Sequence, residues 1–138
     1  NKKGFIMNEI KYGEKEILEF DVNAKEHYWP NENKYDYTIK IELPEFMAKC
    51  PRSGYPDFGT FHLHYVPNKK VIELKALKLY INSFANRYIS HENVVNEIFT
   101  TLYENLEPKW MKLTADFEPR GNVHTVIEID SDSITKEY

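Results

Sequence analysis

The sequence predicts an α+β fold in which an antiparallel, four-stranded sheet carries two helices on one face. Two segments of alternating hydrophobicity come first, two segments of helical periodicity follow, and two further alternating segments end the pattern. This ββααββ order favours hairpin-connected strands with both helices packed on the same side. The 138 residues can form one hydrophobic core, so we expect a single domain over residues 1–138.

The N-terminal segment has the least regular pattern. The chain opens with Asn1 and its first methionine is Met7, so residues 1–6 are set aside as a candidate expression remnant. Residues 7–33 are polar, with scattered aromatic side chains and no clean period. They predict an extended N-terminal arm.

The first two strands are predicted from strict alternation. Apolar side chains recur at every second residue from Tyr35 to Leu43, and this strand should end at Pro44. A second alternation runs from Phe61 to Tyr65 and closes before Pro67. A turn-rich loop should join the two strands.

Helical spacing follows in two segments. Apolar residues from Leu74 to Ala85 predict the first helix, and those from Val94 to Leu106 predict the second, with Ser90 as its N-cap. Alternation returns from Met111 to Phe117 and again from Val123 to Ile129. The link at residues 119–122, Pro-Arg-Gly-Asn, is typical of a hairpin turn.

Composition and charge exclude several classes of protein. Hydrophobic residues make up 41% and charged residues 29%, which is typical of a folded globular chain. The net charge is −4 and the cations form no stripe, so we expect a small polar substrate and no nucleic acid. No apolar run approaches the roughly 20 residues of a membrane helix, and no signal-peptide pattern is evident. We therefore expect no membrane association and a cytoplasmic location.

The only cysteine, Cys50, is the first candidate for chemistry. It precedes Asp57 by seven positions in a loop constrained by prolines and a glycine. A buried thiol and a turn acid would be the ordinary interpretation of this spacing. For catalysis the thiol must become a thiolate, which Arg52 or Lys49 could favour.

Three further groups of residues have both ordinary and functional interpretations. Glu92, next to His91, suits the positive end of the second helix, or could accept hydrogen bonds from a purine-like edge while His91 adds a bond or a proton. Lys75 and Lys78, together with Arg120, are either solvated cations or phosphate ligands. His62, His64 and His124 could bind zinc, although strand-face histidines are the more ordinary interpretation. No glycine-rich dinucleotide or Walker motif occurs.

Four segments together resemble QueF-type nitrile reductases. The segment Glu73–Tyr80, followed by Ser83-Phe84, is similar to the family signature, and Cys50–Phe58 to the catalytic loop. His91-Glu92 resembles the substrate-recognition pair, and Phe117–Gly121 the cofactor hairpin. These segments occur in family order, and the short chain matches the single-domain branch.

This resemblance implies the tunnelling fold, shared with GTP cyclohydrolase I, whose subunits join their sheets into a barrel. A homo-oligomer is then expected, a decamer of two pentamers. The reaction implied is NADPH-dependent reduction of 7-cyano-7-deazaguanine to 7-aminomethyl-7-deazaguanine, in queuosine biosynthesis for tRNA, without a metal.

Residue roles follow by the same resemblance. Cys50 would be the nucleophile that forms a thioimide, and Asp57 the proton donor. His91 and Glu92 would hold the base, and the backbone of Ile72, Glu73 and Leu74 would complete its pocket. Lys75, Lys78 and Arg120 would contact NADPH. Two positions differ from relatives: Ser90 stands where an aromatic residue can stack on the base, and Gly59 where alanine is more usual.

Two other functions remain open. A zinc-dependent pterin or purine cyclohydrolase of the same fold would use Cys50 and histidines as metal ligands. A non-catalytic tunnelling-fold protein would capture a purine-like base at Glu92.

Overall fold

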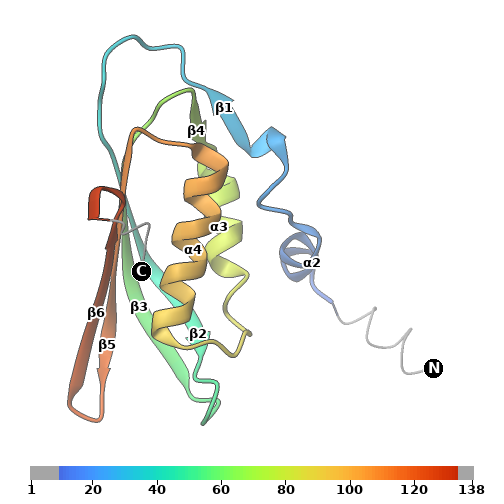
Figure 1. Ribbon diagram of the computed structural model, residues 1–138. Coiled ribbons are helices and arrows are strands. Elements are labelled where there is room, and N and C mark those ends of the chain that lie inside the picture. The colour runs from blue at the N-terminus through green and yellow to red at the C-terminus, as the bar shows by residue number, and fades with distance from the viewer. Residues whose placement is uncertain (1–9, 134–138) are drawn as a thin grey trace.

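The computed structural model describes residues 10–133, and its main layer is an antiparallel sheet in the order β2-β3-β5-β6. Helices α3 and α4 pack side by side on one face of this sheet (Figure 1). The predicted ββααββ order and the coverage of one face are confirmed. The elements of this layer are β2 (Ile39–Lys49), β3 (Pro56–Val66), α3 (Leu74–Asn82), α4 (His91–Leu106), β5 (Trp110–Arg120) and β6 (Val123–Asp130).

The extended arm predicted for residues 7–33 is wrong where the described part forms a helix and a 3-10 turn. Residues Tyr12–Glu19 form helix α2, Lys25–His27 form a 3-10 turn, and Tyr28–Pro30 form strand β1. Strand β1 pairs antiparallel with β4 (Lys70–Ile72) in a separate two-stranded sheet. Helix α2 is rich in Glu, Lys and Leu, which have high helix propensity even where no apolar period is visible. Residues 1–9 lie outside the described part.

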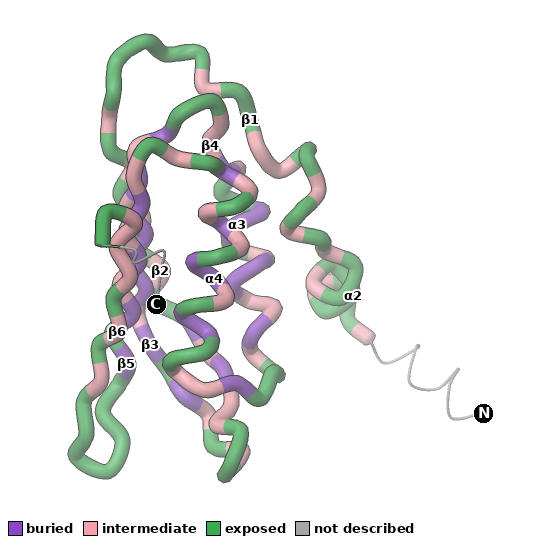
Figure 2. The backbone as a smooth tube through the Cα atoms, in the orientation of Figure 1, coloured by how far each residue is buried: buried purple, intermediate pink, exposed green. Residues whose placement is uncertain are grey.

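In β3 and β5, alternation correctly predicted which residues form the core. Phe61, Leu63 and Tyr65 of β3 are almost fully buried between the sheet and the helices. Leu113 and Phe117 of β5 face the same side. The buried stripes of the helices meet them, as the purple segments of Figure 2 show. Burial of this apolar surface is the main force that holds the helices on the sheet.

The second helix begins where the sequence predicted. Ser90 is its N-cap, and the Ser90 hydroxyl accepts a hydrogen bond from the backbone N–H of Asn93 at 3.1 Å. The hairpin turn is also confirmed, since Gly121 and Asn122 both have positive φ angles, 61° and 68°. Such angles at both central residues suit a two-residue hairpin.

The predicted limits of the first strand are wrong at both ends. Strand β2 begins at Ile39, four residues after Tyr35, and continues through Pro44 to Lys49. It passes Pro44 by means of a β-bulge: Leu43 pairs with Phe61, whereas Phe46 pairs with Gly59, so β2 has one extra residue. Proline can stand there because a bulge leaves a backbone group outside the ladder.

Strand β5 contains a second bulge. Phe117 pairs with Thr125 and Arg120 pairs with Val123, so one extra residue lies between them, at the position of Glu118 and Pro119. Each bulge reverses the alternation of the residues that follow it. Phe46 and Arg120 therefore lie on the helix-covered side of the sheet. With unbroken alternation, both side chains would face the opposite side.

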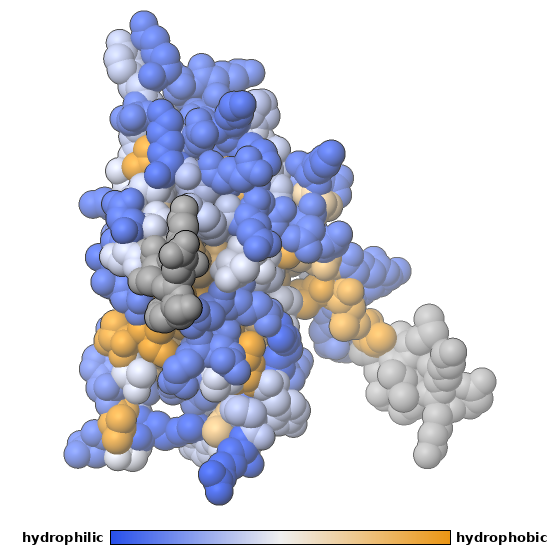
Figure 3. Space-filling view, in the orientation of Figure 1, coloured by the Kyte–Doolittle hydropathy of each residue, from blue (hydrophilic) through white to orange (hydrophobic). Residues whose placement is uncertain are grey.

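The opposite face of the sheet has no covering layer among residues 10–133. Its side chains are mainly polar and form cross-strand pairs, including Thr114 with Glu128 at 2.9 Å and Lys112 with Glu128 at 3.5 Å. In the view of Figure 3 the surface is largely hydrophilic, with hydrophobic side chains gathered on α2 and on the β5–β6 hairpin. No helix in the described part of the chain is long and apolar enough to cross a membrane.

Candidate active site

Cys50 follows the last residue of β2 and opens a tight turn. The backbone N–H of Cys50 donates to the Tyr55 carbonyl at 2.8 Å, and the N–H of Gly54 donates to the Cys50 carbonyl at 2.8 Å. Gly54 has a φ of 74°, which only glycine adopts without strain. These two backbone hydrogen bonds close the turn and hold Cys50 at the end of the sheet.

Asp57 lies in β3 and not in the loop where the sequence placed it. It pairs with Ala48 of β2, and only 7% of its surface is exposed. It is the one charged or polar side chain classed as buried among residues 10–133. Burial of an ionised carboxylate is costly unless it has charged or hydrogen-bonding partners.

Two partners meet the Asp57 carboxylate. Nη1 of Arg120 lies 2.8 Å from Oδ1, and Nε2 of His91 lies 3.3 Å from Oδ2. The His91 nitrogen is close enough for ion pairing, yet it is not aligned for a hydrogen bond and has no other partner. Oδ1 is thus paired with the guanidinium, and Oδ2 faces the imidazole.

The loop between the helices is attached to the end of β2. The N–H of Lys49 donates to the Arg87 carbonyl at 2.9 Å, and the N–H of Ile89 donates to the Lys49 carbonyl at 3.0 Å. These bonds bring the start of α4 beside the residue that precedes Cys50. The structure therefore unites Cys50, Asp57 and His91, which the sequence assigned to one site.

His91 is held by an aromatic contact. Its ring stacks on Phe117 with centroids 4.0 Å apart and planes 11° apart. Glu92 follows in the first turn of α4, and its side chain is exposed to solvent. The carboxylate is thereby available to a ligand, at a helix end that favours negative charge.

The thiol of Cys50 is unusually acidic. Its pKa is lowered from the ordinary 9.0 to about 6, first by a hydrogen bond from the Ser53 hydroxyl. The backbone N–H groups of Ser53 and Arg52 and the side chain of Arg120 lower this pKa further. At neutral pH the sulfur is mainly a thiolate, the form in which a cysteine is a nucleophile.

Sequence reasoning missed the role of Ser53 and the contact between Arg120 and Asp57. The first signal was available, because a serine three residues after a cysteine in a Gly-containing turn can point back at the sulfur. The second depends on the bulge in β5, of which Pro119 is the only sequence sign.

The predicted base-pocket segment lies at the other end of the subunit. Ile72, Glu73 and Leu74 join β4 to the start of α3, whereas the site around Cys50 lies by the start of α4 (Figure 1). They line a separate cavity of about 450 Å³ together with Trp29 and Tyr37. The Glu73 carboxylate accepts a hydrogen bond from the Lys75 N–H at 2.6 Å and so caps α3. One subunit does not bring this segment to Cys50.

The three predicted cofactor cations lie in two places: Lys75 and Lys78 on α3, and Arg120 at the end of β5. Lys75 is exposed and pairs with Glu16 of α2 at 3.6 Å. Lys78 lines a groove of about 320 Å³ between α3 and the bulge of β2. Arg120 instead lines a cavity of about 500 Å³ with Cys50, Arg52, Ser53 and Tyr55.

The three histidines considered for zinc do not form a cluster. His62 and His64 lie in β3, and His124 of β6 pairs with Asp116 of β5 at a sheet position of its own. In the described range 10–133 no group of three His, Cys, Asp or Glu side chains is arranged to hold a metal ion.

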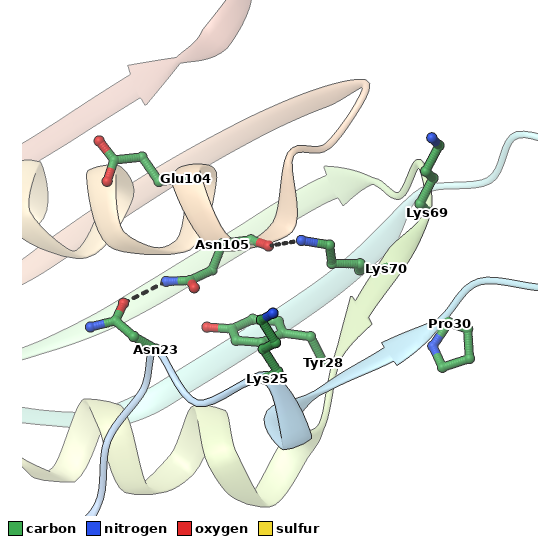
Figure 4. Close-up of a pocket in the computed structure, with 8 residues that line it drawn as sticks. All are labelled: Asn23, Lys25, Tyr28, Pro30, Lys69, Lys70, Glu104 and Asn105. Carbon is green, nitrogen blue, oxygen red and sulfur yellow. Dashed lines mark hydrogen bonds between the residues drawn. The ribbon is translucent and has the colours of Figure 1, made fainter.

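A larger cavity lies between the N-terminal arm and the end of α4. Figure 4 shows its lining, in which the Lys70 ammonium donates to the Asn105 carbonyl at 3.0 Å and the Asn105 amide donates to Asn23 at 2.8 Å. Lys70 thus satisfies a carbonyl at the C-terminus of the helix. These contacts attach the arm to the helix layer.

Comparisons with known proteins identify relatives of this chain. The family model described as QueF-like protein matches residues 56–136. The NADPH-dependent 7-cyano-7-deazaguanine reductase of Sulfurovum sp. (strain NBC37-1) is 73% identical over 124 residues, which cover 90% of this chain and 99% of that protein. The protein of the same name from a Nitratiruptor species is 65% identical, over 92% of this chain and 97% of its own.

A solved structure shares the fold. The archaeosine synthase QueF-Like in its apo form superposes with a TM-score of 0.67, and the match covers 74% of this chain and 100% of that one. The identity is 19%, so this likeness concerns the fold alone. With the family model spanning more than half of the sequence and relatives this similar over nearly their whole length, the chain belongs to the QueF-like protein family.

Proposed function

We propose that this chain reduces 7-cyano-7-deazaguanine to 7-aminomethyl-7-deazaguanine with NADPH, as a step of queuosine biosynthesis. The observation that carries the proposal is the pairing of an acidified, accessible thiol with a buried carboxylate at one end of the sheet. Relatives as much as 73% identical bear the name of this reductase.

The chemistry starts at Cys50. A nitrile carbon is a weak electrophile, and the thiolate adds to it so that a C–S bond forms. One π pair of the nitrile moves to nitrogen, which takes the proton of the Asp57 carboxyl group, and a thioimide results. Because Oδ2 of Asp57 faces His91, that oxygen is the one positioned to carry the proton.

Each of the two reduction steps takes a hydride from NADPH. In the first step the hydride and one proton would convert the thioimide to a thiohemiaminal, from which the Cys50 sulfur would depart to leave an imine, and in the second step a further hydride and proton would give the amine. The chain has residues suited to the cofactor: Lys75 and Lys78 expose ammonium groups on α3, and Lys78 borders an apolar groove floored by Leu43 and Ile81. Together with Arg120 they are our candidates for contacts to its phosphates.

The base is proposed to bind at Glu92 and His91. The two carboxylate oxygens of Glu92 match adjacent N–H donors on a purine-like edge. Ile72, Glu73 and Leu74 are proposed to complete the pocket from a neighbouring subunit, since they lie too far along their own subunit to reach its thiol.

A closed homo-oligomer follows from the same reasoning. The sheet face opposite the helices is open, and a site divided between the two ends of the chain is completed only when copies meet end to end. A decamer of two pentameric rings is the proposed assembly. Light scattering at working concentration tests it, and a monomer there would contradict it. The cytoplasmic location stays a prediction.

The experiment that tests the function measures the protein mass after the Cys50 thiol has reacted with the nitrile. Incubated with the nitrile and without NADPH, the protein should gain the mass of one whole substrate per subunit, because addition to a nitrile expels no leaving group. Cys50→Ala should gain nothing, and Asp57→Asn should react more slowly, because nitrogen is no longer protonated efficiently. On adding NADPH, the extra mass should disappear.

The other outcomes identify the alternatives. Undiminished nitrile reduction by Cys50→Ala would rule out the covalent mechanism. Tightly bound stoichiometric zinc would favour a cyclohydrolase, and nitrile binding without NADPH consumption would favour a purine-binding protein.

A further inference from the structure

Arg120 lies beside both reacting groups. Its Nη1 lies 2.8 Å from Oδ1 of Asp57, and with Cys50 it lines one cavity and lowers the pKa of that thiol. A contact between Arg120 and a cofactor phosphate, as proposed above, would not explain why Arg120 also lies beside Asp57 and Cys50.

The fold places Arg120 there by means of the bulge in β5. Phe117 faces the helices, so regular alternation would turn Arg120 to the open face. The extra residue restores it to the helix side, opposite Val123, and the side chain can then reach Asp57 on the neighbouring strand. The ring of Tyr55 lies against the guanidinium, 5.8 Å from its carbon, and supports its orientation.

We propose that Arg120 is a positioning residue that joins the Asp57 carboxyl group to the Cys50 sulfur through one guanidinium. This inference deepens the proposed function. The guanidinium occupies Oδ1 of Asp57, so only Oδ2 is left to carry the proton that the nitrile nitrogen receives. The same guanidinium holds the sulfur beside that proton, which sets the distance between nucleophile and acid before the substrate arrives.

A planar guanidinium suits this task better than an ammonium group. Its N–H donors point in fixed directions, so two acceptors can be held at once with a defined angle between them. A lysine would supply the charge at one point only. The inference therefore distinguishes the charge of Arg120 from its geometry.

Other charged groups around the thiol must be separated from Arg120. They include Lys49 and Arg52 on the chain beside Cys50, and Asp57 and His91 on the elements that pack next to it. Lys49 lies over the ring of Tyr88, with Nζ 5.5 Å from the ring centre. Arg52 acts on the thiol through its backbone N–H, so its side chain provides a matched control.

The first test needs neither nitrile nor NADPH. The rate of Cys50 alkylation by iodoacetamide is measured against pH, by intact-protein mass, for the wild type and for Arg120→Gln, Arg120→Lys and Arg52→Gln. We expect Arg120→Gln to shift the profile to higher pH and to slow alkylation at pH 6 by up to about threefold, since one of the donors to the thiolate is lost. Arg120→Lys should recover part of the shift, and Arg52→Gln should match the wild type.

The second test separates geometry from charge. Adduct formation with the nitrile, again without NADPH, should be slowed about tenfold or more in both Arg120 variants, because neither holds acid and sulfur together. Wild-type alkylation and wild-type adduct rates in Arg120→Gln would overturn the inference and leave Arg120 a cofactor ligand only. Absence of an adduct in the wild type as well would contradict the proposed function, whereas the alkylation profiles would still decide the role of Arg120.

Discussion

The acidity of Cys50 depends on a turn of only a few residues, and Ser53→Ala is the substitution that tests it. Four hydrogen bonds lower the pKa of the thiol from 9.0 to about 6, and the bond from the Ser53 hydroxyl is the largest of them. The largest of four contributions must supply at least a quarter of the whole. Removing it should therefore reduce the thiolate fraction at pH 6 by about threefold or more.

The sign of the effect is fixed by the direction of the pKa change. The thiolate is populated above the pKa and is lost as pH falls through it. In the wild type the thiol should be roughly nine-tenths ionised at pH 7, whereas a thiol with an ordinary pKa of 9.0 would be about one per cent ionised there. The difference between wild type and Ser53→Ala should thus be greatest below pH 7 and should vanish above pH 9 or so.

The assay is the pH dependence of alkylation by iodoacetamide, followed by intact-protein mass. Ser53→Thr is the matched control, because it retains the hydroxyl and should keep the wild-type profile. The Ser53 hydroxyl also accepts the Tyr55 N–H at 3.2 Å, so the circular dichroism of each variant must be compared to exclude a disrupted turn. A wild-type midpoint near pH 9, or superimposed profiles for Ser53→Ala and wild type, would refute the reasoning.

Two further substitutions test the proposed ligand contacts. Lys75→Ala should raise the KM for NADPH by about tenfold, because one charge-assisted bond to phosphate is lost from an exposed site. Glu16→Gln is the control: it removes only the partner of Lys75 and should not raise the KM. A fall in base affinity in Lys75→Ala would contradict the assignment. Glu92→Gln should weaken base binding measured by calorimetry, since an acceptor becomes a donor facing another donor. Glu104→Gln, at the far end of the same helix, is the control. Unchanged base affinity in Glu92→Gln would leave Glu92 with its helix-dipole role alone.

Local sequence signals predicted the parts of this fold that depend on local physics. Alternation identified the buried side chains of β3, and the hydroxyl of Ser90 marked the start of α4. Gly121 and Asn122 marked the hairpin because few other residues accept positive φ angles. Each of these signals concerns neighbours in sequence and needs no knowledge of the tertiary structure.

The parts that sequence reasoning missed depend on register between strands. Pro44 was interpreted as the end of a strand, because proline cannot donate to the ladder, yet the structure accommodates it in a bulge. The same lack of register information hid the meeting of Arg120 with Asp57. The residues Cys50, Asp57 and His91 could be grouped only through the family resemblance, since no spacing along the chain reveals that the helix loop is attached to Lys49.

The two bulges together explain how β2 and β5 place side chains beside Asp57 on the helix-covered side of the sheet. The central strand β3 keeps an unbroken register with β5 and carries Asp57 on the helix-covered side. The strands on either side of it each contain one extra residue, before Phe46 in β2 and before Arg120 in β5. Phe46 and Arg120 therefore face the helix-covered side as well.

Without the extra residue in β2, every residue after Leu43 would change faces. Phe46 would leave the core for solvent, and the chain would enter the Cys50 turn from the side opposite Asp57. Without the extra residue in β5, Arg120 would face away from the carboxylate. The extra residues lie in β2 and β5 and not in β3, so the two flanking strands change register relative to Asp57. The burial of Phe46, at 1% exposure, ties the first adjustment to the stability of the core, so the register that positions the thiol is also the one that the hydrophobic effect favours.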